Sequence, residues 1–453
     1  MSALTEETHF RELADAVCRP LAGCERVTLH LAAEDSSFLR FNRARVRQAT
    51  QVSQGIATLS LVAGRRRLRA NLTLGGDAAA DRARLLAERD ALLAELPQVR
   101  EDPWLLLPDT VQDSRHEARG ALPAAAQVID AVERAAAAHD FVGFHAGGPV
   151  VRAFADSRGQ RNWHRVESFH FDWCLYHPGG AHDAALRDKA VKSSYAGAAW
   201  DEGEFARRVA EGAVRLPLLA QPARPLAPGP YRAWLEPAAV GELLGAMSWG
   251  GFGLKDRRTG VSPLTRLERG ELALDPRVSL TEATARGGTP AFTEDGFARP
   301  AEVRLVEAGR AADTLASPRS AREYGVAANG ACDEETPQAL VLAPGTLPAS
   351  RTLEALGTGL WISNLWYLNY SDRPNGRVTG MTRFACFRVE DGRLVAPLPV
   401  MRFDDSLLRL FGPGLVELGA EPGLQPDPHT YGQRLLASVT TPGLLVEGLR
   451  LVL

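Results

Sequence analysis

Residues able to bind a metal or transfer a proton gather in residues 164–182. They are His164, His170, Asp172, Cys174, His177 and His182. Residues 168–177 (SFHFDWCLYH) alternate apolar and polar, so they are expected to form a strand with His170, Asp172 and Cys174 on one face. Alternate residues of a strand lie roughly 6–7 Å apart, so a zinc ion there would need ligands from elsewhere. We interpret the cluster as a polar sheet face or interface, with a metal site at His164, His170, Asp172 and Cys174 as the alternative.

Other catalytic patterns are weak. The one His-Glu pair, His116-Glu117, is followed by Gly120 and Ala121 and has no second histidine at metallopeptidase spacing, so we expect a surface loop there. The Gly-rich strings do not match a nucleotide-binding fingerprint, and the sequence has no Gly-x-Ser-x-Gly elbow. Nucleotide-binding and serine-hydrolase readings are therefore not favoured.

The bulk composition is that of an ordinary globular protein. A chain of 453 residues, 45% of them apolar, predicts two domains or one elaborated domain. Charged residues make up 24% of the chain and the net charge is −3, which does not indicate a nucleic-acid or membrane partner. The basic run Arg65–Arg67, with Arg69 beyond it, is predicted to be a solvated turn rather than a phosphate site. Five scattered cysteines, no apolar run of about 20 residues and an acidic N-terminus predict a cytoplasmic protein.

The first half of the chain mixes helical and strand periodicities. Apolar residues at helical spacing predict helices over residues 7–17, 81–96, 123–138 and about 201–214. Alternation predicts strands over residues 27–31, 38–46, 55–62, 70–74 and within 141–176. Residues 216–230 (LPLLAQPARPLAPGP) are rich in proline and are interpreted as an interdomain connection. This places one domain at residues 1–220 and a second at 221–453.

The second half has short apolar runs separated by turn residues. Its one strong helix is predicted over residues 237–247, with proline in the first turn. Strands are predicted over residues 339–342, 359–370, 382–389 and 393–400, the last two joined by an Asp391-Gly392 hairpin turn. This half is therefore expected to be mainly β.

Two distant segments carry a resemblance to a known family. Residues 38–52 (FLRFNRARVRQATQV) and 377–410 (RVTGMTRFACFRVEDGRLVAPLPVMRFDDSLLRL) resemble the TldD/PmbA family of metallopeptidase-related proteins. Leu235-Glu236-Pro237 before a helix and residues 441–451 (TPGLLVEGLRL) resemble its PmbA-type members. The resemblance implies an α+β fold, with an N-terminal α/β domain built on a mixed or antiparallel sheet and a C-terminal β-rich domain. It also implies a dimer that encloses a peptide-processing cavity.

The zinc motif of the family is missing. Zinc-bearing members carry a His-Glu-x-x-x-His helix, and that string does not occur in this sequence. The resemblance places the comparable helix start at residues 236–241 (EPAAVG), where Glu236 and Gly241 replace the two histidines and Pro237 replaces the glutamate. Glycine and proline side chains cannot bind zinc or accept a proton. No cysteine follows Cys386 to match the late cysteine ligand of the family. The chain is therefore expected to have no catalytic residue and no zinc of its own, with zinc in a partner subunit.

The aromatic segment 361–370 (WISNLWYLNY) and the family-like hairpin after it are candidates for peptide contact. Aromatic and amide side chains can hold an extended peptide by strand addition, although a place in the core is equally open. Arg383 is suited to a peptide carboxylate or a partner contact, with a structural salt bridge as the alternative. The predicted cavity residues are Asn364, Tyr367, Asn369, Thr379, Met381 and Arg383.

The leading hypothesis is a non-catalytic TldE/PmbA-like subunit. It would act with a TldD-like, zinc-bearing partner that cleaves small or unfolded peptides, as in peptide maturation, in a heterodimer or a homodimer. One alternative is a self-sufficient metal-dependent hydrolase with a displaced site near His170. The other is a peptide-binding scaffold without proteolytic activity.

Overall fold

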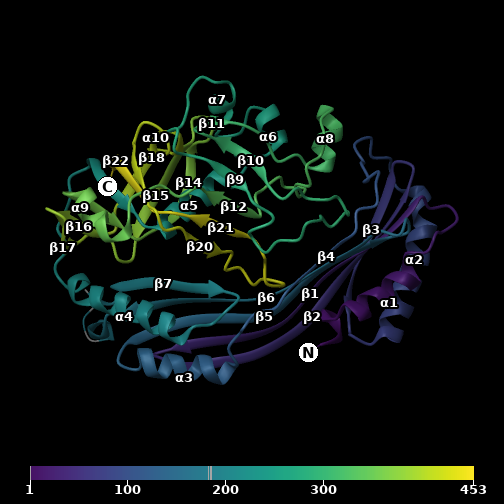
Figure 1. Cartoon of the computed structure of the whole chain (residues 1–453), viewed down its shortest axis with the longest axis horizontal. Helices are drawn as coiled ribbons and strands as arrows, with labels where there is room; N and C mark the ends of the chain where they lie inside the picture. Colours follow the sequence, from purple (N-terminus) through teal and green to yellow (C-terminus); the bar gives the residue numbers. More distant parts are fainter. Residues whose placement is uncertain (1, 182, 184–185, 453) are drawn as a thin grey trace.

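The computed structural model describes residues 2–181, 183 and 186–452, so the predicted ligand His182 lies outside the described residues. The first half folds around one seven-stranded sheet, seen in Figure 1 as a long curved band beneath the second half. The strand order is β3-β2-β1-β5-β6-β4, and β7 also pairs with β6. The strands are β1 (Arg26–Asn42), β2 (Arg45–Ala63), β3 (Arg66–Leu74), β4 (Ser114–Ala118), β5 (Asp140–Asp156), β6 (Arg161–Tyr176) and β7 (Ala190–Gly197).

Four helices cover one face of this sheet. In Figure 1, α1 (Glu7–Val17) and α2 (Ala78–Glu95) lie at one end of the band and α3 (Ala125–Ala136) and α4 (Glu202–Leu219) at the other. Both pairs pack on the odd-numbered residues of β1 and β6. The expected alternation in β6 is confirmed, because Phe169, Phe171, Trp173 and Leu175 are all buried there. The even-numbered residues are left facing the second half of the chain.

Several element boundaries differ from the predictions. Residues 38–46 are not one strand, since Arg43 and Ala44 adopt positive φ angles of 52° and 56° and form a tight turn between β1 and β2. Residues 116 and 117 lie on the short, exposed strand β4 rather than in a loop. Helix α4 continues through Pro217 to Leu219, so the proline-rich connection begins later than expected. The hairpin turn at Asp391-Gly392 is confirmed, with positive φ at both residues.

The second half contains two sheets. One has six strands in the order β11-β10-β9-β12-β21-β20, and the other runs β14-β15-β18-β22-β8-β13-β16-β17 with β19 added on β22. Their strands are β8 (Gly229–Leu235), β9 (Leu280–Glu282), β10 (Val303–Glu307), β11 (Arg310–Ala311), β12 (Ala339–Leu342), β13 (Gly359–Ile362), β14 (Asn364–Asp372), β15 (Arg377–Arg383), β16 (Phe387–Glu390), β17 (Arg393–Pro397), β18 (Arg402–Ser406), β19 (Leu415–Leu418), β20 (Gly423–Pro426), β21 (Ser438–Thr441) and β22 (Leu444–Leu451). The predicted strand over residues 382–389 is therefore interrupted between β15 and β16.

One longer helix lies in the core of the second half. This is α5 (Pro237–Ser248), whose Val240, Leu243, Leu244 and Met247 are fully buried. The other helices are short: α6 (Leu254–Arg258), α7 (Thr265–Glu268), α8 (Pro318–Tyr324), α9 (Thr352–Leu356) and α10 (Leu407–Leu410). The architecture is α+β, with the β-rich second half that was expected. Every described strand before residue 220 belongs to the first sheet, while the domain boundary itself stays a prediction.

No described helix combines the length and the hydropathy required to cross a membrane.

Candidate functional site

The surface between the two halves is built on the polar face of the first sheet. We use "polar face" for the even-numbered residues of β1 from Thr28 to Ser36 and of β6 from Asn162 to Cys174. Because side chains alternate along a strand, these residues point away from the helices and toward the second half. A contact between the two halves confirms this direction, because His164 Nε2 lies 2.7 Å from the carbonyl oxygen of Gly288.

A loop of the second half is fixed to the polar face by Arg434. This loop joins β20 to β21 and descends to the sheet in Figure 1. Arg434 is 3% exposed and donates to the Gly148 carbonyl at 3.0 Å and the Ser168 carbonyl at 2.9 Å, and its backbone N–H donates to Glu34. Burial lowers the pKa of Arg434 to about 10, so it remains charged at neutral pH. The loop therefore closes over the middle of the polar face.

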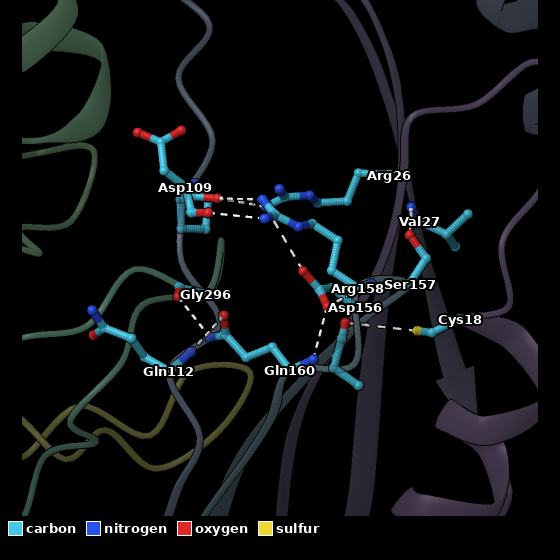
Figure 2. A network of polar contacts seen from close by, with 12 residues as sticks. Cys18, Arg26, Val27, Asp109, Gln112, Asp156, Ser157, Arg158, Gln160 and Gly296 are labelled. Carbon is cyan, nitrogen blue, oxygen red and sulfur yellow. Dashed lines mark hydrogen bonds and ion pairs between the residues drawn. The ribbon is translucent and has the colours of Figure 1, made fainter.

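A second junction lies at the end of β5 (Figure 2). Asp156 accepts backbone hydrogen bonds from Arg158 and Gln160, both at 2.9 Å, and its other oxygen lies 3.7 Å from Arg26. Gln160 then donates its side-chain amide to the carbonyl of Gly296, in the second half, at 2.8 Å. Gly296 has a φ of +81° and lies against the Phe154 ring, where a Cβ atom would clash. The two halves thus meet at fixed points on the same sheet face.

The histidine cluster does not converge on one point. His164 stacks on His116 with ring centroids 5.0 Å apart, whereas His170 lies six residues further along β6 beside Phe144. Burial lowers the pKa of His164 and of His170 to about 4. Within the described ranges, no three His, Cys, Asp or Glu side chains are arranged to hold a metal ion. The arrangement matches a polar sheet face, and the described geometry gives no support to a metal site there.

The far end of the polar face carries acidic groups and one lysine. Burial raises the pKa of Asp172, that of the Cys174 thiol to about 11, and that of Glu242 on α5. Lys192 on β7 is paired in register with Cys174, and its charge opposes the rise at Asp172, Cys174 and Glu242. No local pattern in the sequence indicates Lys192 or Glu242, because the β6–β7 register brings Lys192 to this end of the sheet and the charge of Lys192 acts on both Asp172 and Glu242.

The start of α5 does not supply a zinc site. Glu236 precedes the helix and accepts hydrogen bonds from Arg215 Nη1 at 2.8 Å and from the indole N–H of Trp361 at 2.5 Å. A Cβ atom on Gly241 would lie 3.3 Å from Cγ of Gln425, so a larger side chain at this position must displace its neighbour. Pro237 has no group that accepts a proton. These residues do not fit zinc, and Glu236 is held by structural contacts.

The predicted cavity residues lie on β14 and β15, which pair in antiparallel fashion. Register places Asn364 opposite Arg383 and Asn369 opposite Thr379. Tyr367 is 74% exposed with a φ of +57° at a bulge, Asn369 is exposed, and Asn364 is buried. Thr379, Met381 and Arg383 are half-buried. The predicted cavity residues therefore differ in exposure: Asn364 is in the core, and Tyr367 and Asn369 are on the surface.

Arg383 connects this hairpin to the polar face. Its guanidinium lies over the Trp366 ring, 4.9 Å from the centroid, and it forms no ion pair with any residue in the described part of the chain. Its charge also acts on Cys174 and Tyr176 of β6. Because β14 is the edge strand of its sheet, the exposed Trp366 and Tyr367 stand beside unpaired backbone groups. The arrangement is one that can accept an added strand.

The basic turn after β2 is not a free cationic patch. Arg66 pairs with Glu101 at 3.0 Å, and Arg67 and Arg69 both pair with Asp295 of the second half. The prediction of a solvated turn is wrong for Arg67 and Arg69, because they reach across to the other half of the chain.

Comparisons with known proteins define the class. Residues 228–452 match the family model of the PmbA/TldA metallopeptidase C-terminal domain. A search of curated protein sequences found no match. The second half is thus the C-terminal domain of a metallopeptidase-related protein. The chain belongs to the TldD/PmbA family.

Solved structures share the fold over nearly the whole chain. TldE from Thermococcus kodakarensis superposes with a TM-score of 0.77 at 12% identity, covering 98% of this chain and 100% of that chain. A Bacteroides thetaiotaomicron protein described as a candidate modulator of DNA gyrase gives 0.74 at 16% identity, covering 98% of each chain. A Thermotoga maritima protein with a similar description gives 0.71 at 15% identity, covering 94% and 96%. At these identities the likeness establishes the fold alone.

Proposed function

We propose that this protein is a non-catalytic, TldE/PmbA-like subunit of a zinc metallopeptidase. A TldD-like partner supplies the zinc ion, its bound water and the general base, and this chain supplies part of the chamber that holds the peptide. In this proposal the complex acts on small or unfolded peptides, including peptides undergoing maturation, and it is located in the cytoplasm.

One observation carries the proposal. The residues at the start of α5, where zinc-bearing relatives have their motif, make structural contacts in this chain. Glu236 accepts hydrogen bonds from Arg215 and Trp361, and a Cβ atom on Gly241 would lie 3.3 Å from Gln425. A zinc peptidase needs ligands that hold the metal and a base that takes a proton from its water, and neither is available at this position. We therefore propose that this chain, which lacks zinc ligands at this position, acts in a complex with a family member that binds zinc.

The β14–β15 hairpin provides the peptide contacts in this proposal. Tyr367 and Asn369 are exposed on the edge strand, and Arg383 lies over the Trp366 ring while its charge acts on Cys174 of the polar face. An extended peptide added to β14 would pair with its backbone and rest on these side chains. Thr379 and Met381 continue the same face of β15, while the buried Asn364 would position the strand rather than touch the peptide.

Native mass spectrometry of the protein alone, and then mixed with a zinc-bearing TldD-like protein, tests the proposal. We expect a metal-free chain that forms a one-to-one complex with the partner, and peptide cleavage only in the mixture. One zinc per chain with cleavage by this protein alone would overturn it in favour of a self-sufficient hydrolase. An intact complex in which this chain changes neither the rate nor the products of cleavage would indicate a binding scaffold instead.

A further inference from the structure

A cavity of about 550 Å³ lies between the polar face and loops of the second half. Its floor is formed by His30 of β1, Arg69 of β3 and Arg152 of β5, and its walls by residues 289–299, 330–338 and 427–437. None of its described lining residues comes from α5 or from the β14–β15 hairpin. It is therefore a separate place in the molecule from the proposed peptide-processing chamber.

Arg152 brings an unpaired positive charge to the floor. Its Nη1 donates to the carbonyl of Val151 at 2.8 Å and its Nη2 to the carbonyl of Arg434 at 3.3 Å. Among the residues described, no carboxylate lies within ion-pair distance of Arg152, although the charges of Glu294 and Glu34 act on it from further away. The two other lining arginines form ion pairs, Arg69 with Asp295, which also pairs with Arg67, and Arg299 with Glu282. Arg152 is thus the cation on this floor that is open to an anionic ligand.

Two further polar groups on the cavity wall have no partner in the described chain. His30 is 5% exposed and forms no hydrogen bond there, and burial with the nearby Arg152 lowers its pKa to about 3. Its neutral ring offers one donor and one acceptor. Thr289 is also 5% exposed, and its hydroxyl is buried without a hydrogen bond. Buried polar groups are normally satisfied, so both side chains are available for hydrogen bonds to a molecule in the cavity.

The rim of the cavity has the opposite charge. Glu294, Asp333 and Glu334 line it and are exposed, and none of them forms a hydrogen bond or ion pair with a described residue, although the charges of Arg69 and Arg152 act on Glu294. A ligand that enters would meet carboxylates at the mouth and a guanidinium at the floor. This order of charges suits a molecule with a cationic group at one end and a carboxylate at the other.

We propose that this cavity binds a short peptide with free termini, with its carboxylate against Arg152 and His30 and its ammonium group at the acidic rim. A planar guanidinium recognises a carboxylate by two parallel hydrogen bonds. The volume is within the range of small-molecule pockets. A phosphate ion fits less well, because one unpaired arginine beside a neutral histidine does not balance its charge and the rim repels it. The proposal does not rest on the proposed function, because it concerns the chain alone.

Calorimetric titration of the purified full chain tests this with four probes: trialanine, its C-terminal amide, its N-acetyl form and inorganic phosphate. We expect trialanine to bind, amidation to weaken binding at least about tenfold because the charge-assisted bonds are lost, and acetylation to weaken it severalfold. Phosphate should not displace the peptide. Equal affinity for the free and amidated peptides, displacement by phosphate, or no binding at millimolar concentration would overturn the proposal.

Variants locate the site. Arg152→Gln should weaken trialanine binding at least about tenfold, and Arg152→Lys should retain part of the affinity. Arg286→Gln is the matched control, because Arg286 is exposed in the neighbouring loop and does not line the cavity. Full affinity in a folded Arg152→Gln protein would place the peptide elsewhere and overturn the proposal. If that variant does not fold, the amidated probe on the unmodified protein decides the question.

Discussion

Trp361 donates its indole N–H to a carboxylate oxygen of Glu236 at 2.5 Å, and Arg215 donates to the same oxygen. Glu236 comes directly before α5 and Trp361 lies on β13, beside the strand β8 that leads into the helix. The carboxylate thus fixes where α5 begins relative to two strands. Glu236 therefore serves as an anchor between these elements.

Restoring the zinc motif should not restore a zinc site. In a Glu236→His, Pro237→Glu, Gly241→His variant, the new side chain at position 241 meets Gln425 and the anchor to Arg215 and Trp361 is lost. The variant should bind well below one zinc per chain by elemental analysis and show no peptidase activity alone. The single change Glu236→Gln, which keeps the size of the side chain, is its control for folding. Stoichiometric zinc with activity would contradict the structural assignment of this site.

Arg434 should contribute strongly to stability. Arg434→Ala removes the side-chain hydrogen bonds to Gly148 and Ser168 and the positive charge that acts on the buried Glu34, so the free energy of unfolding should fall by about 2–4 kcal/mol. Urea denaturation of the chain measures this.

The matched control for that change is Arg11→Ala, because Arg11 forms an exposed pair with Glu7 on α1. Such pairs are worth about 0–1 kcal/mol. Equal effects of the Arg434 and Arg11 substitutions would show that the loop between β20 and β21 is not held by its buried arginine.

Local periodicity predicted much of this fold, and long-range pairing could not be predicted. The alternation in residues 168–177 identified which side chains of β6 are buried, because each strand residue faces opposite to the next. The contact of Arg434 with Glu34 joins residues 400 apart in the sequence. No local pattern indicates such a contact. The same limit applies to Lys192, which is brought near Asp172 only by the β6–β7 register.

The tight turn at Arg43-Ala44 was missed for a different reason. Two-residue hairpin turns with positive φ usually contain glycine or asparagine, and neither residue type occurs at these positions. The candidate hairpin at β14–β15 was found because its sequence resembles a family segment. Its bulge at Tyr367, which determines what is exposed, gave no signal in the sequence.

Acid should destabilise the protein through its buried histidines. Burial lowers the pKa of four histidines: His164 and His170 to about 4, and His30 and His145 to about 3. A histidine in the unfolded chain binds a proton near pH 6.5, so the unfolded state binds more protons as the pH falls below that value. This stabilising contribution is complete above about pH 6.5 and is lost as the pH falls toward 4, at about 2 kcal/mol per histidine between pH 7 and pH 5.

Urea denaturation at pH 7, 6 and 5 measures this dependence. The slope of stability against pH should be smaller in His170→Gln than in the unmodified protein. Equal slopes in the His170 variant and the unmodified protein would mean that His170 is not held neutral in the folded state.

Asp172 should oppose stability at neutral pH. Burial raises the pKa of this carboxyl, so the folded state binds its proton more tightly than the unfolded state does. Its contribution therefore favours folding below the unfolded pKa and is lost as the pH rises through the folded value. Asp172→Asn keeps the shape and removes the charge, so it should raise the melting temperature at pH 7 and have little effect near pH 4. A lower melting temperature at pH 7 would show that the ionised carboxylate is needed by its surroundings.

Trp366 should matter for peptide turnover and not for folding. Trp366 is 51% exposed on the edge strand β14, and the Arg383 guanidinium covers one side of its ring. Trp366→Ala should raise the KM of the complex with a zinc-bearing partner severalfold, since an aromatic contact to a bound chain is worth about 1 kcal/mol, and should leave kcat unchanged. Tyr431→Ala is the control, because Tyr431 is 95% exposed on a different loop. An equal KM in the two variants would remove β14 from the peptide path, and a loss of complex formation in Trp366→Ala would assign this edge to the subunit contact instead.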